Sequence, residues 1–335
     1  MSEPLHLAFL GCGFIARVHS QQLKALRREF SCSYASRDAG KSAAYCREFG
    51  GRASYQDYES AIADPRVDAV VIAVPPRFHR ELALLALANG KHVLVEKPAF
   101  PELDDYRAVI DARDRTGRTV LVGENDHYKP LAVTLRSLLG DGAIGDLVFA
   151  CFTTIVKRLK TADDWRNDED MAGGDAFFEE GIHWLHFANS LGPTISSIHG
   201  YRPLPSRSGP DTRVKSMMVA FQYAEGAVGS LLYSREIPSL FKGLRLSKLF
   251  GRHGIITFES NGVFVIARGT GLPRIILPGF SDIRGYKAMY RDFAASIRHK
   301  RQPEMSLERA VQDHALMERV YESLMPDHSS RIAQR

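Results

Sequence analysis

A short glycine-containing segment near the N-terminus has the composition of a phosphate-binding loop. Gly11, Gly13 and Ala16 follow the pattern G-x-G-x-x-A, directly after an apolar run at residues 5–10 and before a helical pattern. In this context the first glycine permits a tight turn, the second lets the backbone approach a pyrophosphate, and the third residue lets the helix pack closely. The helix N-terminus adds N–H groups and partial positive charge. The segment predicts a dinucleotide site with four cofactor contacts: Gly11, Gly13, Phe14 and Ile15.

Three residues after the next apolar run bear on which dinucleotide binds. In dinucleotide-binding βαβ units, an acidic residue about 20 residues past the glycines bonds the ribose 2′-hydroxyl of NAD. Here Ser36 and Arg37 come first, and a hydroxyl beside a guanidinium suits the 2′-phosphate of NADP. Asp38 lies one or two positions late and can instead cap the following helix. The segment favours NADP over NAD, and both cofactors stay open.

A lysine stands just past the apolar run at residues 92–95, within the sequence Glu96-Lys97-Pro98. Ligands of open parallel sheets bind beyond the carboxyl ends of the strands. A lysine at that place can hydrogen-bond a substrate oxygen and transfer a proton, provided that its surroundings favour proton exchange. The alternative is an exposed lysine paired with Glu96, and these residues alone do not decide between the two.

The elements that must position these residues alternate along the first third of the chain. Amphipathic stretches that predict helices separate five apolar runs that predict strands: residues 5–10, 30–35, 69–74, 92–95 and 119–122. The run at 69–74 has no polar alternation, as a strand buried on both faces requires. Residues 1–124 are therefore predicted to form an α/β domain, a doubly wound parallel sheet of the Rossmann type with helices on both faces.

The pattern changes after residue 125. Six runs predict strands, several of them joined by short glycine-containing turns: residues 147–159, 217–223, 227–234, 244–250, 254–259 and 263–267. Short turns connect antiparallel neighbours. Residues 125–335 are therefore predicted to form an α+β domain with an open, mostly antiparallel sheet, which is available to cover the cofactor and substrate or to pair with another subunit. Three helices are expected with it, at residues 175–190, 286–299 and 306–324.

Several motifs in this order resemble the Gfo/Idh/MocA family, named for glucose–fructose oxidoreductase and inositol dehydrogenase. The N-terminal motifs are Gly11–Ala16, Val74-Pro75-Pro76-Arg77-Phe78-His79 and the run Gly90–Pro98. The later ones are Trp165-Arg166, Gly173-Gly174 and Glu179-Glu180-Gly181-Ile182-His183. The resemblance covers residues 5 to about 192, and more loosely reaches residue 324. The combination is more specific than any single motif.

The resemblance implies an NAD(P)-dependent dehydrogenase or reductase of sugars, sugar derivatives or cyclitols. It implies that Lys97 is the general acid/base and that His183, with the acidic Glu179 one helical turn before it, contacts the substrate hydroxyls. It also implies a cis Lys97–Pro98 bond and a homodimer or homotetramer built by the C-terminal sheet. The further residues expected around the cofactor are Val74, Pro75, His79, Glu96, Asn125, Trp165 and Arg166.

The later helix departs from the family pattern, which usually has Asp at the position of Glu179 and a second Asp at that of His186. Glu179 and His183 are at i and i+4, so both can face one cleft. The extra methylene of Glu moves the carboxylate by roughly 1.3 Å, and catalytic positioning is sensitive on that scale. Glu179, His183 and His186 also invite a metal interpretation. No further ligand pair has recognisable spacing, and no metal is expected.

Composition restricts the partners. The 335 residues carry a net charge of +5, but charges of both signs are interleaved without the basic stripe typical of nucleic-acid binding. No apolar run approaches the roughly 20 residues of a membrane helix, and no signal-peptide pattern opens the chain. Four scattered cysteines fit reduced thiols in the cytoplasm. The expected partner is a small sugar-like substrate, without nucleic acid or membrane.

Two other functions stay open at this point. The first is a non-catalytic regulatory protein that binds a dinucleotide or a sugar. The Glu179 and His186 departures favour it, whereas Lys97 and the glycine loop favour an enzyme. The second is an enzyme that keeps NAD(P) tightly bound and uses transient oxidation for elimination or glycoside cleavage. Net redox change distinguishes it from a dehydrogenase, which consumes free cofactor.

Overall fold

The computed structural model describes residues 3–158, 164–204, 215–238 and 244–324. The chain forms two compact units. The first comprises Met1–Tyr128, Trp165–Gly174 and Gly285–Val311, and the second comprises Lys129–Asp164, Asp175–Arg284 and Gln312–Arg335. Each unit is therefore assembled from segments that lie far apart in the sequence.

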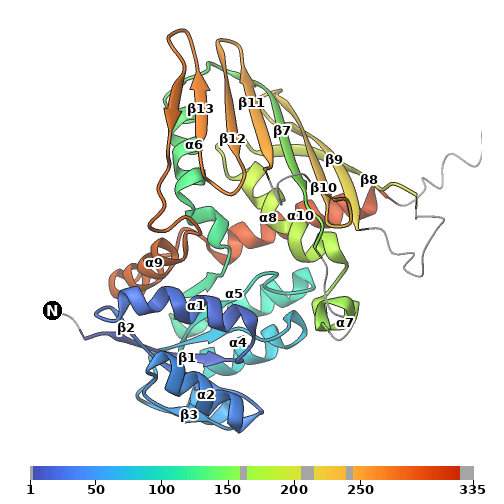
Figure 1. Cartoon of the computed structure of the whole chain (residues 1–335). Coiled ribbons are helices and arrows are strands. Elements are labelled where there is room, and N and C mark those ends of the chain that lie inside the picture. The colour runs from blue at the N-terminus through green and yellow to red at the C-terminus, as the bar shows by residue number, and fades with distance from the viewer. Residues whose placement is uncertain (1–2, 159–163, 205–214, 239–243, 325–335) are drawn as a thin grey trace, which may run out of the picture. The chain divides into compact units, whose positions relative to one another are not determined.

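The first unit contains a six-stranded parallel sheet with the strand order β3-β2-β1-β4-β5-β6 (Figure 1). Its strands are β1 (Leu5–Leu10), β2 (Phe30–Ala35), β3 (Ser54–Tyr55), β4 (Ala69–Ile72), β5 (His92–Val95) and β6 (Val120–Val122). The chain builds outward from β1 to β3, and then from β4 to β6 on the other side of β1. Because parallel crossovers are right-handed, this reversal places the connecting helices on both faces of the sheet. The predicted doubly wound sheet is confirmed.

Helices of the first unit connect and cover these strands. They are α1 (Phe14–Leu23), α2 (Ala39–Phe49), α3 (Tyr58–Ala63), α4 (His79–Ala88), α5 (Leu103–Thr116), α7 (Glu169–Ala172) and α9 (Tyr286–His299), with 3-10 turns η1 (Lys24–Leu26), η2 (Pro76–Phe78), η3 (Asn125–Tyr128) and η4 (Trp165–Asn167). Asp292 of α9 accepts hydrogen bonds from the Tyr128 hydroxyl and the Glu304 amide, both at 2.8 Å. The Met305 carbonyl accepts a bond from Val122 N at 3.1 Å. The segment after α9 thus pairs with the edge strand β6.

The second unit contains an eight-stranded sheet with the order β14-β13-β12-β11-β7-β10-β9-β8. Its strands are β7 (Leu147–Ile155), β8 (Ile195–Tyr201), β9 (Ser216–Tyr223), β10 (Val228–Ser234), β11 (Leu246–Gly251), β12 (Gly254–Glu259), β13 (Val265–Arg268) and β14 (Arg274–Ile276). Neighbours are antiparallel except β7 and β10, which run parallel. The mostly antiparallel sheet is therefore confirmed.

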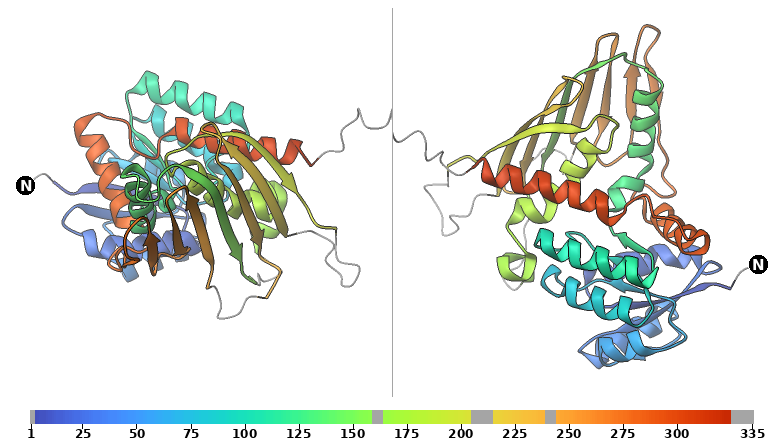
Figure 2. Two further views of the ribbon diagram at one scale, coloured as in Figure 1. Left: turned by 90° about the horizontal axis from the view of Figure 1, so that it is seen from above. Right: turned by 180° about the vertical axis from the view of Figure 1, so that it is seen from behind.

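Helices cover one face of this second sheet (Figure 2). They are α6 (Pro130–Gly140), α8 (Ala176–Asn189) and α10 (Leu307–Glu322), whose residues from 312 onward belong to this unit. Burial alternates along β7. Ala150 and Phe152 lie in the core, whereas Phe149, directly before Ala150, is 50% exposed on the opposite face. Alternation of this kind is expected for a sheet that is covered on one side.

Three elements of the second unit were not predicted: α6, β8 and the edge strand β14. Helix α6 begins with Pro130 in its first turn, a position that proline favours, and buries Leu131 and Leu135 on one side. Strand β8 alternates buried Ile195 and Ile198 with exposed polar residues. Among the helices of the described residues, none combines the length and the apolar character needed to cross a membrane.

Candidate active site

Three neighbouring strands of the first unit end at the same level. Leu10 of β1 is paired with Ile72 of β4, which is paired with Val95 of β5. The pairing continues one residue further, since Ala73 N donates to Leu10 O at 2.9 Å and Glu96 N donates to Ile72 O at 3.1 Å. The loops that follow β1, β4 and β5 therefore meet at one edge of the sheet, where the strand order reverses. Ligands of such sheets bind at this edge.

The glycine loop after β1 has the backbone that the sequence predicts. Gly11 has φ +109°, and a Cβ there would lie 2.6 Å from the Ala73 carbonyl oxygen, so the position requires glycine. Gly13 is the N-cap residue of α1, and a Cβ added to it would meet no heavy atom within 4 Å. No side chain caps α1 among the described residues, and its first turn holds no acidic residue. The helix start is therefore open to an anion.

The structure shows which residue after β2 caps the following helix, a role that the sequence left open for Asp38. Asp38 is the N-cap of α2, because its Oδ1 accepts a hydrogen bond from Lys41 N at 3.1 Å. The Ser36 hydroxyl accepts one from Asp38 N, also at 3.1 Å. The Arg37 guanidinium lies 5.7 Å from the centre of the Phe78 ring. The late acidic residue thus caps a helix, and a hydroxyl and a guanidinium precede it.

Lys97 follows β5, and its bond to Pro98 is cis, as the resemblance implies. The lysine is half-buried, and its backbone N donates to Glu96 Oε2 at 3.3 Å. Glu96 is buried with its Oε1 2.8 Å from Nε2 of His19, and His19 Nδ1 lies 2.6 Å from the hydroxyl of Tyr290. Glu96 is therefore directed into the unit, towards α1 and α9. Sequence reasoning missed His19 and Tyr290, which are 271 positions apart.

His79 connects two of the loops at this edge. Its Nδ1 lies 2.9 Å from the Ala99 carbonyl oxygen and its Nε2 lies 2.8 Å from that of Val74. Burial lowers the pKa of His79 from its ordinary value of 6.5. A neutral imidazole donates to one of these two carbonyls. His79 thereby joins the loop after β4 to the loop after Pro98, and its contact with the cofactor stays a prediction.

The remaining predicted cofactor residues also belong to the first unit: Phe14, Ile15, Pro75, Asn125, Trp165 and Arg166. Phe14 is 70% exposed at the start of α1. Asn125 Nδ2 donates to Asp126 Oδ1 at 3.1 Å, and the Arg166 guanidinium lies 5.0 Å from the Trp165 ring centre. One unit therefore contains the whole predicted cofactor set, including Lys97.

Glu179 and His183 lie on helix α8 of the second unit. Asp175 caps this helix by accepting bonds from the amides of Phe177 and Phe178 at 2.8 and 3.1 Å. Glu179, in the first turn, accepts a 2.9 Å bond from the buried guanidinium of Arg235. The i, i+4 spacing places Glu179 and His183 on one face of α8.

His186, which stands where the family pattern has an aspartate, contacts an acidic residue of another helix. Its Nδ1 lies 2.7 Å from Oδ2 of Asp313 on α10, and both side chains are buried. The imidazole at position 186 is thus paired with a carboxylate of another helix. Of the metal ligands considered from the sequence, His186 and Glu179 have Asp313 and Arg235 as partners. Neither partner was found from sequence, because each lies more than 50 positions away.

Comparison with known families agrees with this geometry. Residues 5–124 match the model of an oxidoreductase family with an NAD-binding Rossmann fold, and residues 132–256 match the GFO/IDH/MocA C-terminal domain. The chain belongs to the Gfo/Idh/MocA oxidoreductase family. The dinucleotide that the glycine loop predicts is therefore a nicotinamide cofactor, and the protein is a nicotinamide-dependent oxidoreductase.

Relatives of the chain span nearly its full length. Levoglucosan dehydrogenase of Pseudarthrobacter phenanthrenivorans is 26% identical over 86% of this chain and 80% of its own length. D-xylose 1-dehydrogenase (NADP(+)) 2 of Haloferax volcanii is 25% identical over 88% and 89%. The solved aldose-aldose oxidoreductase of Caulobacter crescentus, complexed with glycerol, shares the fold with a TM-score of 0.85 and 21% identity, over 96% of this chain and 97% of that one.

The two glycines of the loop should respond differently to alanine. Gly11→Ala is expected to destabilise the protein by about 2 kcal/mol or more, because φ is positive and the new methyl meets backbone. Gly13→Ala should change stability by no more than about 1 kcal/mol, yet weaken NADPH binding at least about tenfold by filling the space next to the helix start. Urea unfolding and NADPH fluorescence titration measure both effects. Tight NADPH binding by Gly13→Ala would contradict this loop as the pyrophosphate site.

Proposed function

We propose that the protein transfers a hydride between C4 of the nicotinamide and a hydroxyl- or carbonyl-bearing carbon of a sugar, sugar derivative or cyclitol, with Lys97 as general acid/base. The observation that carries the proposal is the placement of Lys97, half-buried at the carboxyl end of β5 in the unit that contains the glycine loop. A bound nicotinamide supplies or accepts the hydride. The protein supplies orientation and the proton, which Lys97 gives to the carbonyl oxygen or takes from the hydroxyl.

The first unit fits the nicotinamide dinucleotide in three respects. The start of α1 offers uncapped N–H groups and the partial positive charge of a helix N-terminus. The space at Gly13 lets a pyrophosphate approach the backbone. Val74 and Pro75, after β4, stand between the glycine loop and Lys97, at the edge where a nicotinamide is expected in this topology.

Glu179 and His183 contact the substrate hydroxyls in this proposal, and sugar-like compounds are the substrate class. Relatives at 25–28% identity carry the names of levoglucosan, D-xylose and inositol dehydrogenases. Each of those names denotes oxidation of a polyhydroxylated ring or aldose. An acidic acceptor and an imidazole on one helical face suit the recognition of adjacent hydroxyls.

NADP is the preferred cofactor. Ser36 and the exposed Arg37 precede the acidic residue at the end of β2, and Asp38 is engaged in capping α2. A hydroxyl and a guanidinium suit a phosphate, which an unpaired carboxylate at the same place would repel.

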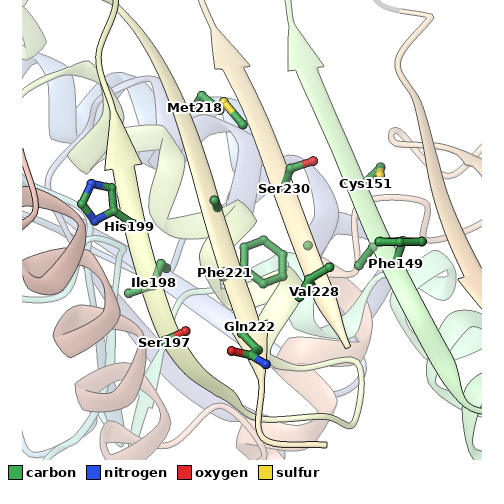
Figure 3. A pocket seen from close by; sticks show the side chains of 13 residues that line it. Phe149, Cys151, Ser197, Ile198, His199, Met218, Phe221, Gln222, Val228 and Ser230 are labelled. Atoms are coloured by element: carbon green, nitrogen blue, oxygen red, sulfur yellow. The ribbon is translucent and has the colours of Figure 1, made fainter. Parts of the chain in front are cut away.

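The open face of the second sheet is the subunit interface of a homodimer or homotetramer. A hollow of about 600 Å³ lies on this face, with Phe149, Met218 and Val228 among its lining (Figure 3). Large apolar side chains on the same face are between 37% and 50% exposed: Phe149, Met218, Val228, Leu232, Leu246 and Ile266. Large exposed apolar side chains gathered on one sheet face are typical of an interface.

Lys97→Ala tests the proton-transfer role. With levoglucosan, D-xylose and myo-inositol as probes, the wild type is expected to reduce NADP+ with at least one, and Lys97→Ala to lower kcat by about 100-fold or more. NADPH affinity should stay within about fivefold, because Lys97 is not a phosphate ligand. The exposed Lys24→Ala is the control. Undiminished turnover would remove Lys97 from the mechanism, and sugar conversion without net NADP+ reduction would instead indicate transient oxidation by a retained cofactor.

Arg37→Ala tests the cofactor preference. Losing a charge-assisted contact to the 2′-phosphate should raise the Kd for NADPH by about 10- to 100-fold and change that for NADH by less than about threefold. Arg52→Ala, an exposed arginine of the same unit, is the control. Isothermal titration measures the affinities of the wild type and both variants for NADPH and NADH. Tighter binding of NADH than NADPH by the wild type would overturn the assignment.

Charge on the open sheet face should prevent assembly. Met218 and Leu232 are directly opposed on β9 and β10, so Met218→Asp/Leu232→Asp places paired carboxylates in the centre of the patch. We expect light scattering after gel filtration to give a monomer for this variant and a dimer or tetramer for the wild type, because buried unpaired charges cost several kcal/mol. Val133→Asp, at an exposed position of α6, is the control. A monomeric wild type would contradict the proposed interface.

A further inference from the structure

A buried arginine stands beside Glu179. Arg235 directly follows β10, its side chain is 5% exposed, and its Nη1 lies 2.9 Å from Glu179 Oε2 and 3.5 Å from Glu180 Oε1. The sheet holds its backbone on both sides, since Arg235 N donates to Lys215 O at 3.1 Å and Arg158 N donates to Arg235 O at 3.0 Å. The backbone of Arg235 is therefore held by hydrogen bonds on both sides, and the ion pairs with Glu179 and Glu180 hold its guanidinium.

Arg235 lies beside two carboxylates, and that of Glu179 is the nearer one. Glu180 also lies 3.0 Å from Arg158 Nη1 and 3.2 Å from the Tyr233 hydroxyl. Burial raises the pKa of Tyr233, so its hydroxyl stays protonated, and this proton is shared with the Ala176 carbonyl oxygen at 2.9 Å. The shortest contact of Arg235 is with Glu179, whose side chain is 12% exposed. Arg235 thus makes its shortest contact with Glu179, whereas Arg158 contacts Glu180.

We propose that Arg235 is a positioning residue of the sugar site: its guanidinium holds the Glu179 carboxylate ionised and in one place, one helical turn before His183. Glu179 then accepts hydrogen bonds from substrate hydroxyls and does not exchange the proton of the reaction. This inference rests on the proposed function and assigns substrate hydrogen bonding to Glu179 and proton exchange to Lys97.

Two physical arguments support this role. A glutamate side chain has one more rotatable bond than an aspartate, so its carboxylate needs an anchor to keep a defined place, and holding it costs side-chain entropy. A guanidinium is permanently charged and stabilises a carboxylate in its ionised form, which makes that carboxylate a good acceptor and a poor proton donor. Proton exchange therefore falls to Lys97.

A double-mutant cycle tests the proposal through kcat and KM for whichever of levoglucosan, D-xylose and myo-inositol the wild type oxidises. Arg235→Met should lower kcat/KM for the sugar by about 10- to 100-fold, the range for a hydrogen bond to a charged group. The NADPH Kd should change by less than about threefold, and Arg235→Lys, which keeps the charge, should recover kcat/KM to within about fivefold of wild type.

In the Glu179→Gln background, Arg235→Met should lower kcat/KM by less than about a further threefold. The matched control Arg158→Met removes the guanidinium paired with Glu180, and its kcat/KM should stay within about threefold of wild type.

Specific outcomes would overturn the inference. Independent, multiplying losses in the double variant, or an equal loss in Arg158→Met, would show that Arg235 does not act through Glu179. Loss of activity in Glu179→Gln as complete as in Lys97→Ala would make Glu179 a proton carrier. If Arg235→Met fails to fold, Arg235→Lys and the double variant, which removes both charges, still decide the question. A wild type that oxidises no probe contradicts the proposed function, whereas an active wild type with an unaffected Arg235→Met contradicts this inference alone.

Discussion

Backbone hydrogen bonds between β1, β4 and β5 align Leu10, Ile72 and Val95, and the places of the dinucleotide-side residues follow from that alignment. Because side chains alternate along a strand, a slip of one residue would turn the side chains of that strand to the other face of the sheet. The register brings the glycine loop, the Val74 segment and Lys97 to one edge of the sheet. Gly11 is required there because the Ala73 carbonyl leaves no room for a Cβ. Backbone pairing therefore determines where the loops after β1, β4 and β5 lie relative to one another.

In the second unit, buried pairs of polar side chains hold residues of α8 in place. The two positions of α8 that depart from the family pattern each have a buried partner: Arg235 for Glu179 and Asp313 for His186. Removing one member of a buried pair leaves an uncompensated charge, so such pairs are stable only as a set. The departures therefore rearrange the polar groups of α8 without leaving them unpaired.

Local patterns predicted the elements whose periodicity is strong. The apolar runs at β1, β2 and β5 predict the observed bounds, and Gly11, Gly13 and the cis Lys97–Pro98 bond were identified from motifs. Short β3, the edge strand β14, α6 and β8 were missed. Contacts such as His19–Glu96 and Arg235–Glu179 could not be predicted, because they join positions 77 and 56 residues apart (96 − 19 and 235 − 179) through tertiary packing. Asp38 was ambiguous for a local reason, because one carboxylate can either cap a helix or bind a ribose. Its place in the sequence is explained by its capping of α2.

Isotope transfer tests the central claim most directly. The protein would be incubated with NADP+ and a pool of levoglucosan, D-xylose and myo-inositol that carry deuterium on every hydroxyl-bearing carbon. Mass spectrometry of the reduced dinucleotide would then locate the label. The account predicts NADPH with one deuterium at C4 of the nicotinamide, formed from at least one member of the pool. Firm NADP+ binding with no deuterium at C4 from any of them would contradict hydride transfer from a sugar-like substrate.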